Sequence, residues 1–250
     1  MYIMDDGIRL NAKLEKPDAD RCPLVIVIHG FTGHMEEEHL LAVSRMLNEN
    51  GFATLRVDMY GHGKSEGRFR DHTLYKWLTN AMTVIDYARS LEFVTDIYLC
   101  GHSQGGLTVI LAAALKHDVI KGLIALAPAC MIPELARTGG LLGTRFDPDH
   151  IPEELTVWDS HVLGNNYVRV AQTIHVEEAI DRYDGPVLIV QGEKDGEDLK
   201  ASAVAAAERY RDCRFVMIPE DMHCFNVHMD QMVRAVREWI LERNGTKQGE

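Results

Sequence analysis

The chain has 250 residues, of which 46% are hydrophobic and 26% are charged, a composition that excludes a wholly disordered protein. Its formal net charge of −12 repels polyphosphate, so we expect no nucleic acid partner. Residues 1–10 lack the apolar core of a signal peptide and no apolar run approaches the length of a membrane span, so we expect no membrane partner either.

The cysteines are odd in number and widely spaced, at Cys22, Cys100, Cys130, Cys213 and Cys224. No two of them form a Cys-x-x-Cys pair, and three adjoin or enter apolar runs. They therefore predict small buried side chains rather than half-cystines, and a cytoplasmic location.

The amino-terminal part alternates short β-like runs with helical patterns. Residues 8–14 follow an Asp-Gly turn signal and predict an edge strand. The unbroken β-branched run at 24–28 is typical of a strand buried on both faces of a parallel sheet. A helix over 36–50, a strand over 53–57 and a long helix over 74–91 complete this part.

The middle of the chain continues the alternation and then breaks it. Residues 96–100 predict a strand, 107–115 a helix and 121–126 another strand. Residues 129–183 then connect two core strands, and this connection is much longer than one that contains a single helix. The segment contains prolines, paired glycines and aromatic residues. A stretch this long inside a compact domain is usually functional or separately folded, so we interpret it as an inserted cap.

The alternation resumes towards the carboxyl end. The elements expected there are a strand at 186–190, a helix at 201–210, a strand at 214–218 and an amphipathic helix at 231–243. This pattern predicts an α/β fold with a doubly wound, mostly parallel twisted sheet flanked by helices. The predicted organisation is a core at 1–128, an inserted cap at 129–183 and a second core segment at 184–250.

A nucleophile is predicted at Ser103, within Gly-His-Ser-Gln-Gly at 101–105. This G-x-S-x-G pattern needs glycines because the serine occupies a strained turn between a strand and a helix, where flanking side chains would collide. A predicted strand leads into the motif and a predicted helix leads out of it. That context separates the motif from a glycine-rich turn of no chemical meaning.

A serine that attacks a carbonyl needs two N–H donors for the oxyanion. One should be the backbone N–H of Gln104, the residue after the nucleophile. The second should come from the loop after an early strand, where His-Gly-Phe-Thr-Gly at 29–33 predicts the N–H of Phe31. We expect His29 to be structural and to bond this loop.

The acid and the base should follow the serine in that order. Asp195 lies on the loop after the strand at 186–190, with Glu193 and Asp198 as rivals. His223 lies on the loop after the last predicted strand, from which a general base can reach the serine hydroxyl, and His228 is its rival.

Two other classes of site match less well. Residues 61–65 resemble the end of a P-loop, but the first glycine of that motif would fall at Asp58, whose carboxylate would repel phosphate. Asp58 is better explained as an anchor for a loop near the site. His34 and His39 are five residues apart, off the helical face that a zinc H-E-x-x-H motif needs. We therefore expect no metal and no cofactor.

With these motifs, the chain resembles the α/β-hydrolase superfamily of serine esterases and, more narrowly, the bacterial cinnamoyl (feruloyl) esterases. The local matches are His-Gly-Phe-Thr-Gly-His at 29–34, Asp-Met-Tyr-Gly-His-Gly-Lys-Ser at 58–65, Asp-His-Thr-Leu-Tyr-Lys-Trp-Leu at 71–78 and Tyr-Val-Arg-Val-Ala-Gln at 167–172. The family commonly has Val-Pro shortly after the acid, where this chain has Glu-Asp-Leu at 197–199.

The resemblance implies that the cap roofs the cleft and holds the ring of a hydroxycinnamate ester. Trp158 would then line the acyl pocket, with Tyr167 and Gln172 as neighbours. The alternative is that Trp158 and Tyr167 pack the cap's own small core.

The expected function is that of a serine carboxylester hydrolase cleaving feruloyl-type esters through an acyl-enzyme, with Ser103, Asp195 and His223 as catalytic residues. A lipase or monoacylglycerol-type esterase for aliphatic esters would use the same residues, and a non-catalytic binding protein of this fold is the alternative from another class. The partner expected is a small-molecule ester, and a homodimer is left open.

Overall fold

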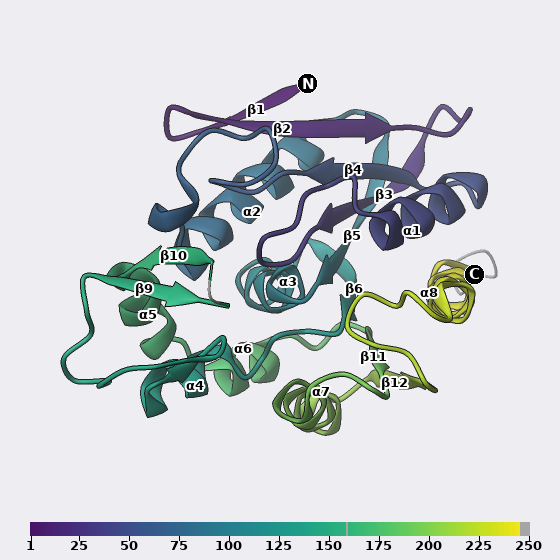
Figure 1. The fold of residues 1–250 in the computed structure, drawn as a ribbon. Helices are drawn as coiled ribbons and strands as arrows, with labels where there is room; N and C mark the ends of the chain where they lie inside the picture. Colours follow the sequence, from purple (N-terminus) through teal and green to yellow (C-terminus); the bar gives the residue numbers. More distant parts are fainter. Residues whose placement is uncertain (159, 246–250) are drawn as a thin grey trace.

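The computed structural model describes residues 1–158 and 160–245, and an eight-stranded sheet forms its centre (Figure 1). The strands are β1 (Tyr2–Asp5), β2 (Ile8–Glu15), β3 (Cys22–Ile28), β4 (Ala53–Val57), β5 (Val94–His102), β6 (Ile120–Leu126), β11 (Val187–Gly192) and β12 (Cys213–Ile218). Their order across the sheet is β1-β2-β4-β3-β5-β6-β11-β12.

The six strands from β4 to β12 are parallel to one another, and β2 and β1 add an antiparallel edge. The predicted α/β fold with a mostly parallel sheet is therefore confirmed. The edge position predicted for residues 8–14 is wrong, because β1 pairs with the outer side of β2. Asp6 and Gly7 both have positive φ, which lets them form the tight turn that folds β1 back on β2.

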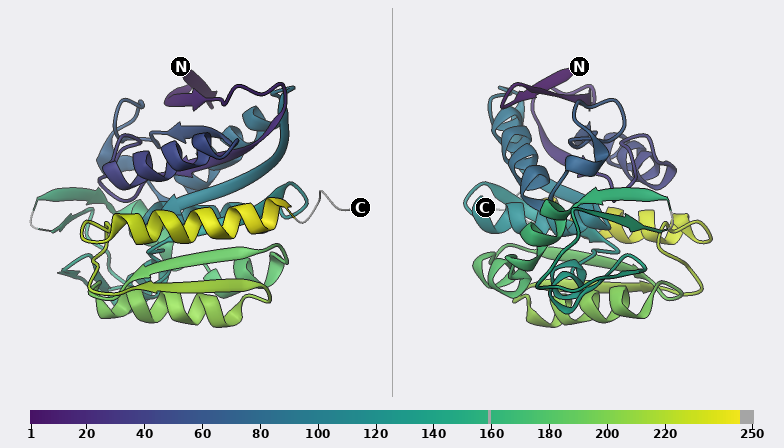
Figure 2. Two further views of the ribbon diagram at one scale, coloured as in Figure 1. Left: turned by 90° about the vertical axis from the view of Figure 1, so that its right-hand side faces the viewer. Right: turned by 60° about the vertical axis from the view of Figure 1, so that its left-hand side comes forward.

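Helices cover both faces of the sheet, as the two views in Figure 2 show. The helices of the core are α1 (Glu38–Glu49), α2 (Leu74–Arg89), α3 (Gln104–Leu115), α7 (Glu197–Arg209) and α8 (Met229–Gly245). Val25 and Val27 of β3 belong to the same hydrophobic cluster as residues of α1 and α8, whereas Leu24, Ile26 and Ile28 belong to a second cluster with residues of α2, α3 and α7. The apolar run of β3 thus has both of its faces buried, as its sequence predicts. Among the described residues, no helix combines the length and apolarity that crossing a bilayer requires.

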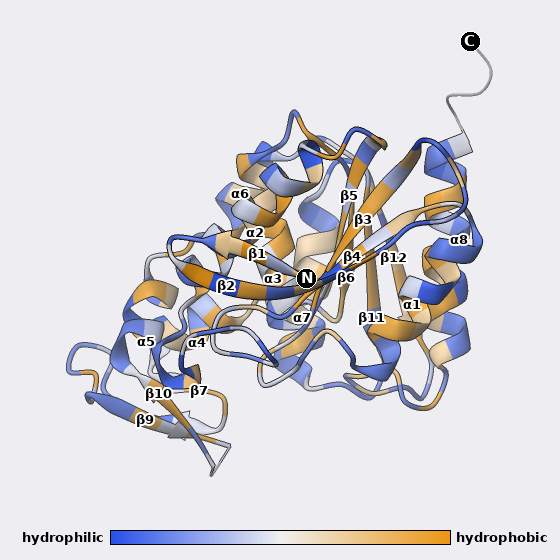
Figure 3. Cartoon of the chain, turned by 90° about the horizontal axis from the view of Figure 1, so that it is seen from above, coloured by the Kyte–Doolittle hydropathy of each residue, from blue (hydrophilic) through white to orange (hydrophobic). Residues whose placement is uncertain are grey.

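The segment between β6 and β11 holds the other elements. They are α4 (Ile132–Thr138), β7 (Gly140–Leu141), β8 (Thr144–Arg145), β9 (Glu154–Val157), β10 (His161–Gly164), α5 (Asn165–Gln172) and α6 (Val176–Arg182). Figure 3 shows α4, α5, β9 and β10 gathered at one end of the molecule, beyond the hydrophobic strands.

The contacts of this segment differ along its length. Strand β10 lies against the short 3-10 helix η1 (Phe69–Asp71), and α5 packs on α4 and α2, whereas α6 packs on α3 and α7 of the core. The cap boundaries at 129 and 183 stay a prediction, and residues 246–250 of the second core segment lie outside the described residues.

Candidate active site

Ser103 lies in a sharp turn between β5 and α3, with φ of 56° and ψ of −119°. Such a positive φ is strained for a residue that carries a Cβ atom. A side chain on Gly101 would overlap the backbone of Gly105, and one on Gly105 would overlap the backbone at the end of β3. The two glycines of the motif therefore allow the strand, the turn and the helix to pack closely enough to expose the serine at the sheet edge.

The loop after β3 passes directly beside Ser103. A Cβ atom on Gly30 would lie 2.9 Å from the Cβ atom of Ser103, so only glycine fits there. The next residue is Phe31, whose backbone N–H has no hydrogen-bond partner in the described part of the chain. Gln104 is the first residue of α3, where a backbone N–H has no partner inside the helix. Two N–H groups thus flank the serine from separate elements.

His29 holds this loop. Its Nε2 accepts a hydrogen bond from the N–H of Met59 at 3.0 Å, so Nδ1 carries the proton and donates to the carbonyl of Gly30 at 2.7 Å. Burial lowers the pKa of His29 to about 3, which keeps the ring neutral. Both ring nitrogens are occupied by backbone groups, in agreement with the structural role expected for His29.

His223 lies between Ser103 and Asp195. Its Nε2 is 2.8 Å from the Oγ of Ser103, and its Nδ1 is 2.8 Å from the Oδ2 of Asp195. Because a carboxylate only accepts, Nδ1 carries the proton and Nε2 offers a lone pair to the serine hydroxyl. The arrangement can remove a proton from Ser103 and stabilise the imidazolium that results.

Asp195 is fixed by three donors. Besides His223, the side-chain amide of Gln191 donates to Oδ2 at 2.8 Å and the N–H of Gly196 donates to Oδ1 at 2.7 Å. Burial pushes the pKa of Asp195 upward, but the hydrogen bond from His223 and these two donors bring it below its ordinary value. The carboxyl group is therefore ionised at neutral pH.

The rival residues lie elsewhere. The carboxylate of Glu193 accepts from the N–H of Glu220, and Asp198 is exposed in the first turn of α7. His228 donates only its backbone N–H, to Asp221. Among the described residues, none of the three forms a hydrogen bond or ion pair with Ser103 or His223.

Sequence reasoning missed two residues that hold His223. Asp221 is fully buried, and its carboxylate accepts from the backbone N–H groups of Met222, Val227 and His228, which closes the loop around His223. The Nε2 of His102 lies 2.9 Å from the backbone carbonyl of His223. His102 adjoins the nucleophile in the motif, but nothing in the sequence indicates its distant contact.

An aromatic cluster surrounds Phe31 beside the serine. The ring of Trp158 packs edge-to-face on Phe31 with 5.1 Å between centroids, and Phe69 packs on it at 5.2 Å. Trp158 is 50% exposed, so much of its indole is open to a ligand. Of the three residues predicted to line the acyl pocket (Trp158, Tyr167 and Gln172), Trp158 combines exposure with a ring contact to Phe31.

Tyr167 and Gln172 make contacts within the protein. Tyr167 is fully buried, and its hydroxyl donates to the Oε1 of Gln104 at 2.6 Å. The amide of Gln172 donates to the carbonyls of Ala136 and Pro148. These contacts tie the segment over the site to α3 and to itself, which favours a bracing role for both residues over contact with substrate.

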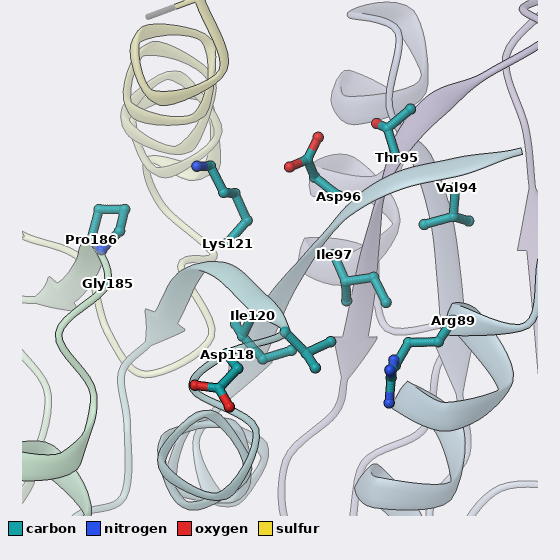
Figure 4. Close-up of a pocket in the computed structure, with 11 residues that line it drawn as sticks. Arg89, Val94, Thr95, Asp96, Ile97, Asp118, Ile120, Lys121, Gly185 and Pro186 are labelled. Carbon is teal, nitrogen blue, oxygen red and sulfur yellow. The ribbon is translucent and has the colours of Figure 1, made fainter. Parts of the chain in front are cut away.

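A large pocket lies away from these residues. It measures about 690 Å³ and lies at the amino ends of β5 and β6, opposite the end where Ser103 follows β5 (Figure 4). Arg89, Asp96, Asp118 and Lys121 supply its charged groups (Figure 4). Ligands in α/β sheets bind beyond the carboxyl ends of the strands, so this pocket is not the candidate active site.

A parallel sheet with a strained serine between β5 and α3, and with a carboxylate and a histidine on later loops, defines an α/β hydrolase. The likeness to solved structures agrees: mouse α/β hydrolase domain-containing protein 10, at 18% identity, has a TM-score of 0.74 over 97% of this chain and 98% of its own. The chain belongs to the family described as serine aminopeptidase, S33, whose profile matches residues 19–153.

Among solved structures, the chain is similar to Est1E from Butyrivibrio proteoclasticus with ferulic acid bound. Identity is 57%, the TM-score is 0.96, and the match covers 98% of this chain and 99% of Est1E. Among curated relatives, human monoglyceride lipase is 29% identical over 66% of this chain and 55% of its own length. Human ABHD12B is 31% identical over 34% of this chain. The chain thus spans about half of the first of these two relatives and about a quarter of the second.

Proposed function

We propose that this protein is a serine carboxylester hydrolase that cleaves esters of hydroxycinnamic acids, of the feruloyl type. The observation that carries the proposal is its 57% identity over nearly the whole chain with Est1E, a protein whose structure contains bound ferulic acid. The half-exposed indole of Trp158 beside Phe31 supports it, because an aromatic edge and face suit a phenolic ring.

In the proposed reaction, Ser103 attacks the ester carbonyl while His223 takes its proton at Nε2. Support comes from the 2.8 Å separation of these two atoms. Asp195 keeps the proton of His223 on Nδ1 and stabilises the imidazolium. The N–H groups of Phe31 and Gln104 donate to the oxyanion of the tetrahedral intermediate.

The remaining steps of the reaction use the same groups. His223 returns its proton to the leaving alcohol, which leaves a feruloyl group bound to the Oγ of Ser103. Water then gives a proton to Nε2 of His223 and attacks the acyl group, and the acid departs as Ser103 recovers its proton. Each step uses side chains and backbone N–H groups that meet at the carboxyl edge of the sheet.

An aliphatic acyl ester is the second candidate substrate, because human monoglyceride lipase matches two thirds of the chain. The test compares initial rates on methyl ferulate with rates on short- and medium-chain p-nitrophenyl esters, with Ser103→Ala as the control. Higher kcat/KM on methyl ferulate that is lost in Ser103→Ala supports the proposal. Preference for the p-nitrophenyl esters would mean that the substrates are aliphatic acyl esters rather than hydroxycinnamate esters. The absence of Ser103-dependent turnover on any ester would favour a non-catalytic binding protein.

A cytoplasmic location is a further part of the proposal, and the homodimer stands beside a monomer as an alternative. The location is supported by the five cysteines, which are free thiols, with Cys22, Cys100 and Cys130 buried. Light scattering on the eluting protein measures the mass of the particle, and a value of one chain would contradict the dimer.

A further inference from the structure

Three buried polar atoms near the loop of His223 have no hydrogen-bond partner among the described residues. Among the described residues, the Oε2 of Glu37, the Nε2 of His39 and the Nδ1 of His102 are buried and have no hydrogen-bond partner. One ligand atom from each of these residues lies within 4.8 Å of the other two. Buried polar groups in folded proteins are nearly always paired, and three unpaired atoms this close together can all be satisfied by one common partner.

The tautomer of His102 is determined by its other contact. Its Nε2 lies 2.9 Å from the carbonyl of His223, and a carbonyl only accepts, so Nε2 carries the proton. The lone pair is therefore on Nδ1, the unpaired atom. Donation of the far ring N–H to a backbone carbonyl is how metal-binding histidines are usually oriented.

The imidazole rings of His39 and His102 pack against each other and are buried. The rings of His39 and His102 lie 4.3 Å apart, and each residue is only 3% exposed. Burial lowers the pKa of His39 to about 4 and that of His102 well below its ordinary value. Glu37 as a whole residue is only partly buried, although its Oε2 atom is buried.

The loop after β3 leaves space for this cluster. A Cβ atom on Gly30 would lie 3.1 Å from the Nδ1 of His102, and one on Gly33 would overlap the carboxylate of Glu37. Side chains at these two positions would fill the volume in front of the unpaired atoms. The glycines of the loop therefore leave room for the side chains of His102 and Glu37.

We propose that Glu37, His39 and His102 form a binding site for a divalent transition metal ion of the zinc type. Two imidazoles and one carboxylate are a known zinc ligand set, which leaves the fourth position to water. A tetrahedral zinc ion holds its ligands about 3.3 Å apart, so modest side-chain rotations complete the site. The site joins α1, which starts at Glu38, to the end of β5 and, through His102, to the loop of His223.

The expected consequence is stabilisation of the fold by zinc. An ion that binds only the folded state stabilises it by an amount that grows with the logarithm of the ratio of free ion concentration to the dissociation constant. At a zinc concentration one hundred times the dissociation constant, we expect the Tm of a tag-free, chelator-treated protein to rise by roughly 5–10 °C. Isothermal titration calorimetry with Zn²⁺ alone should give one site per chain.

Variants separate this site from adventitious binding. Glu37→Gln and His39→Gln should each lose most of the Tm rise and the calorimetric site. We expect Glu37→Gln to fold, because it changes a partly exposed side chain. His117→Gln replaces an exposed histidine far along the chain and should respond as the wild type does. The site is supported if His117→Gln shows the same Tm rise and Zn²⁺ binding as the wild type while Glu37→Gln and His39→Gln show neither.

Three results would overturn the proposal. They are the absence of saturable Zn²⁺ binding to the wild type, equal binding by Glu37→Gln and His39→Gln, and an equal Tm rise with Mg²⁺, which imidazoles bind poorly. Because the readouts are heat and Tm, the result does not depend on which ester the enzyme cleaves.

Discussion

The two sides of the candidate active site are built differently. On the sheet side, Asp195 accepts three hydrogen bonds and Asp221 accepts three more, and both carboxylates serve to fix His223. On the cap side, Trp158 is half exposed and meets the site loop through one edge-to-face ring contact with Phe31. The groups that move protons are held by buried polar contacts, whereas the surface that would select the acyl group is exposed and aromatic.

The largest effect should follow from a change on the sheet side. Asp195→Asn removes the charge that stabilises the imidazolium and favours the wrong tautomer of His223, so kcat should fall by about 10⁴-fold. Steady-state kinetics on the preferred ester measure it.

Asp198→Asn is the matched control, because Asp198 is exposed in α7 and forms no hydrogen bond with His223 in the described structure. It should keep nearly all of the activity. If Asp198→Asn were the more damaging of the two changes, the assignment of Asp195 as the acid would be wrong.

An effect on stability should follow acidification of the sheet side. Burial lowers the pKa of His62 to about 4 and the pKa values of His29 and His72 to about 3, while an unfolded histidine titrates near 6.5. The unfolded chain therefore binds more protons between pH 6.5 and about 4, and the free energy of unfolding falls as the pH falls through that window. Each such histidine contributes a slope of up to about 1.4 kcal/mol per pH unit.

Urea unfolding at pH 7, 6 and 5 measures this loss of stability. His62→Gln should lose less stability between pH 7 and pH 5 than the wild type does, whereas His117→Gln, on the surface, should follow the wild type. A wild type whose free energy of unfolding is unchanged between pH 7 and pH 5 would contradict the neutral state of the buried rings.

The smallest effect should follow a change on the cap side. Trp158→Ala removes the exposed indole, and we expect kcat/KM on methyl ferulate to fall by about tenfold, since an aromatic contact and its buried area together are worth about 1–2 kcal/mol. Rates on p-nitrophenyl acetate should change little, because its acyl group is too small to reach the indole.

Tyr2→Ala is the control here, since it removes an exposed aromatic side chain from β1. It should leave both rates unchanged. Equal losses on both esters in Trp158→Ala would instead mean that Trp158 packs the cap, the alternative that the sequence leaves open.

Local patterns predicted much of this molecule. The strands and helices of the core follow from short-range periodicity. The G-x-S-x-G motif at Ser103 indicates a nucleophile because a predicted strand precedes it and a predicted helix follows it. Asp195 and His223 could be proposed because the carboxyl ends of parallel strands share one edge of the sheet. The structure brings these two residues together with Ser103, whereas it ties Tyr167 and Gln172 into contacts within the protein.

Contacts between distant residues were not predictable in this way. Asp221 lies in a loop whose sequence gives no sign that three backbone N–H groups converge on it. His39 and His102 are 63 positions apart, and their rings are neighbours only because the fold brings the start of α1 to the end of β5. The edge strand β1 was missed because four residues are too few for a reliable alternation.

The central claim is that His223 activates Ser103 to form an acyl-enzyme with a hydroxycinnamate ester. Rapid mixing of the enzyme with methyl ferulate, an acid quench and intact-protein mass spectrometry test it most directly. We predict a mass increase of one feruloyl group, located at Ser103 by peptide mapping and absent in Ser103→Ala. Turnover of methyl ferulate without any acylated enzyme, or with the acyl group on another residue, would contradict the account.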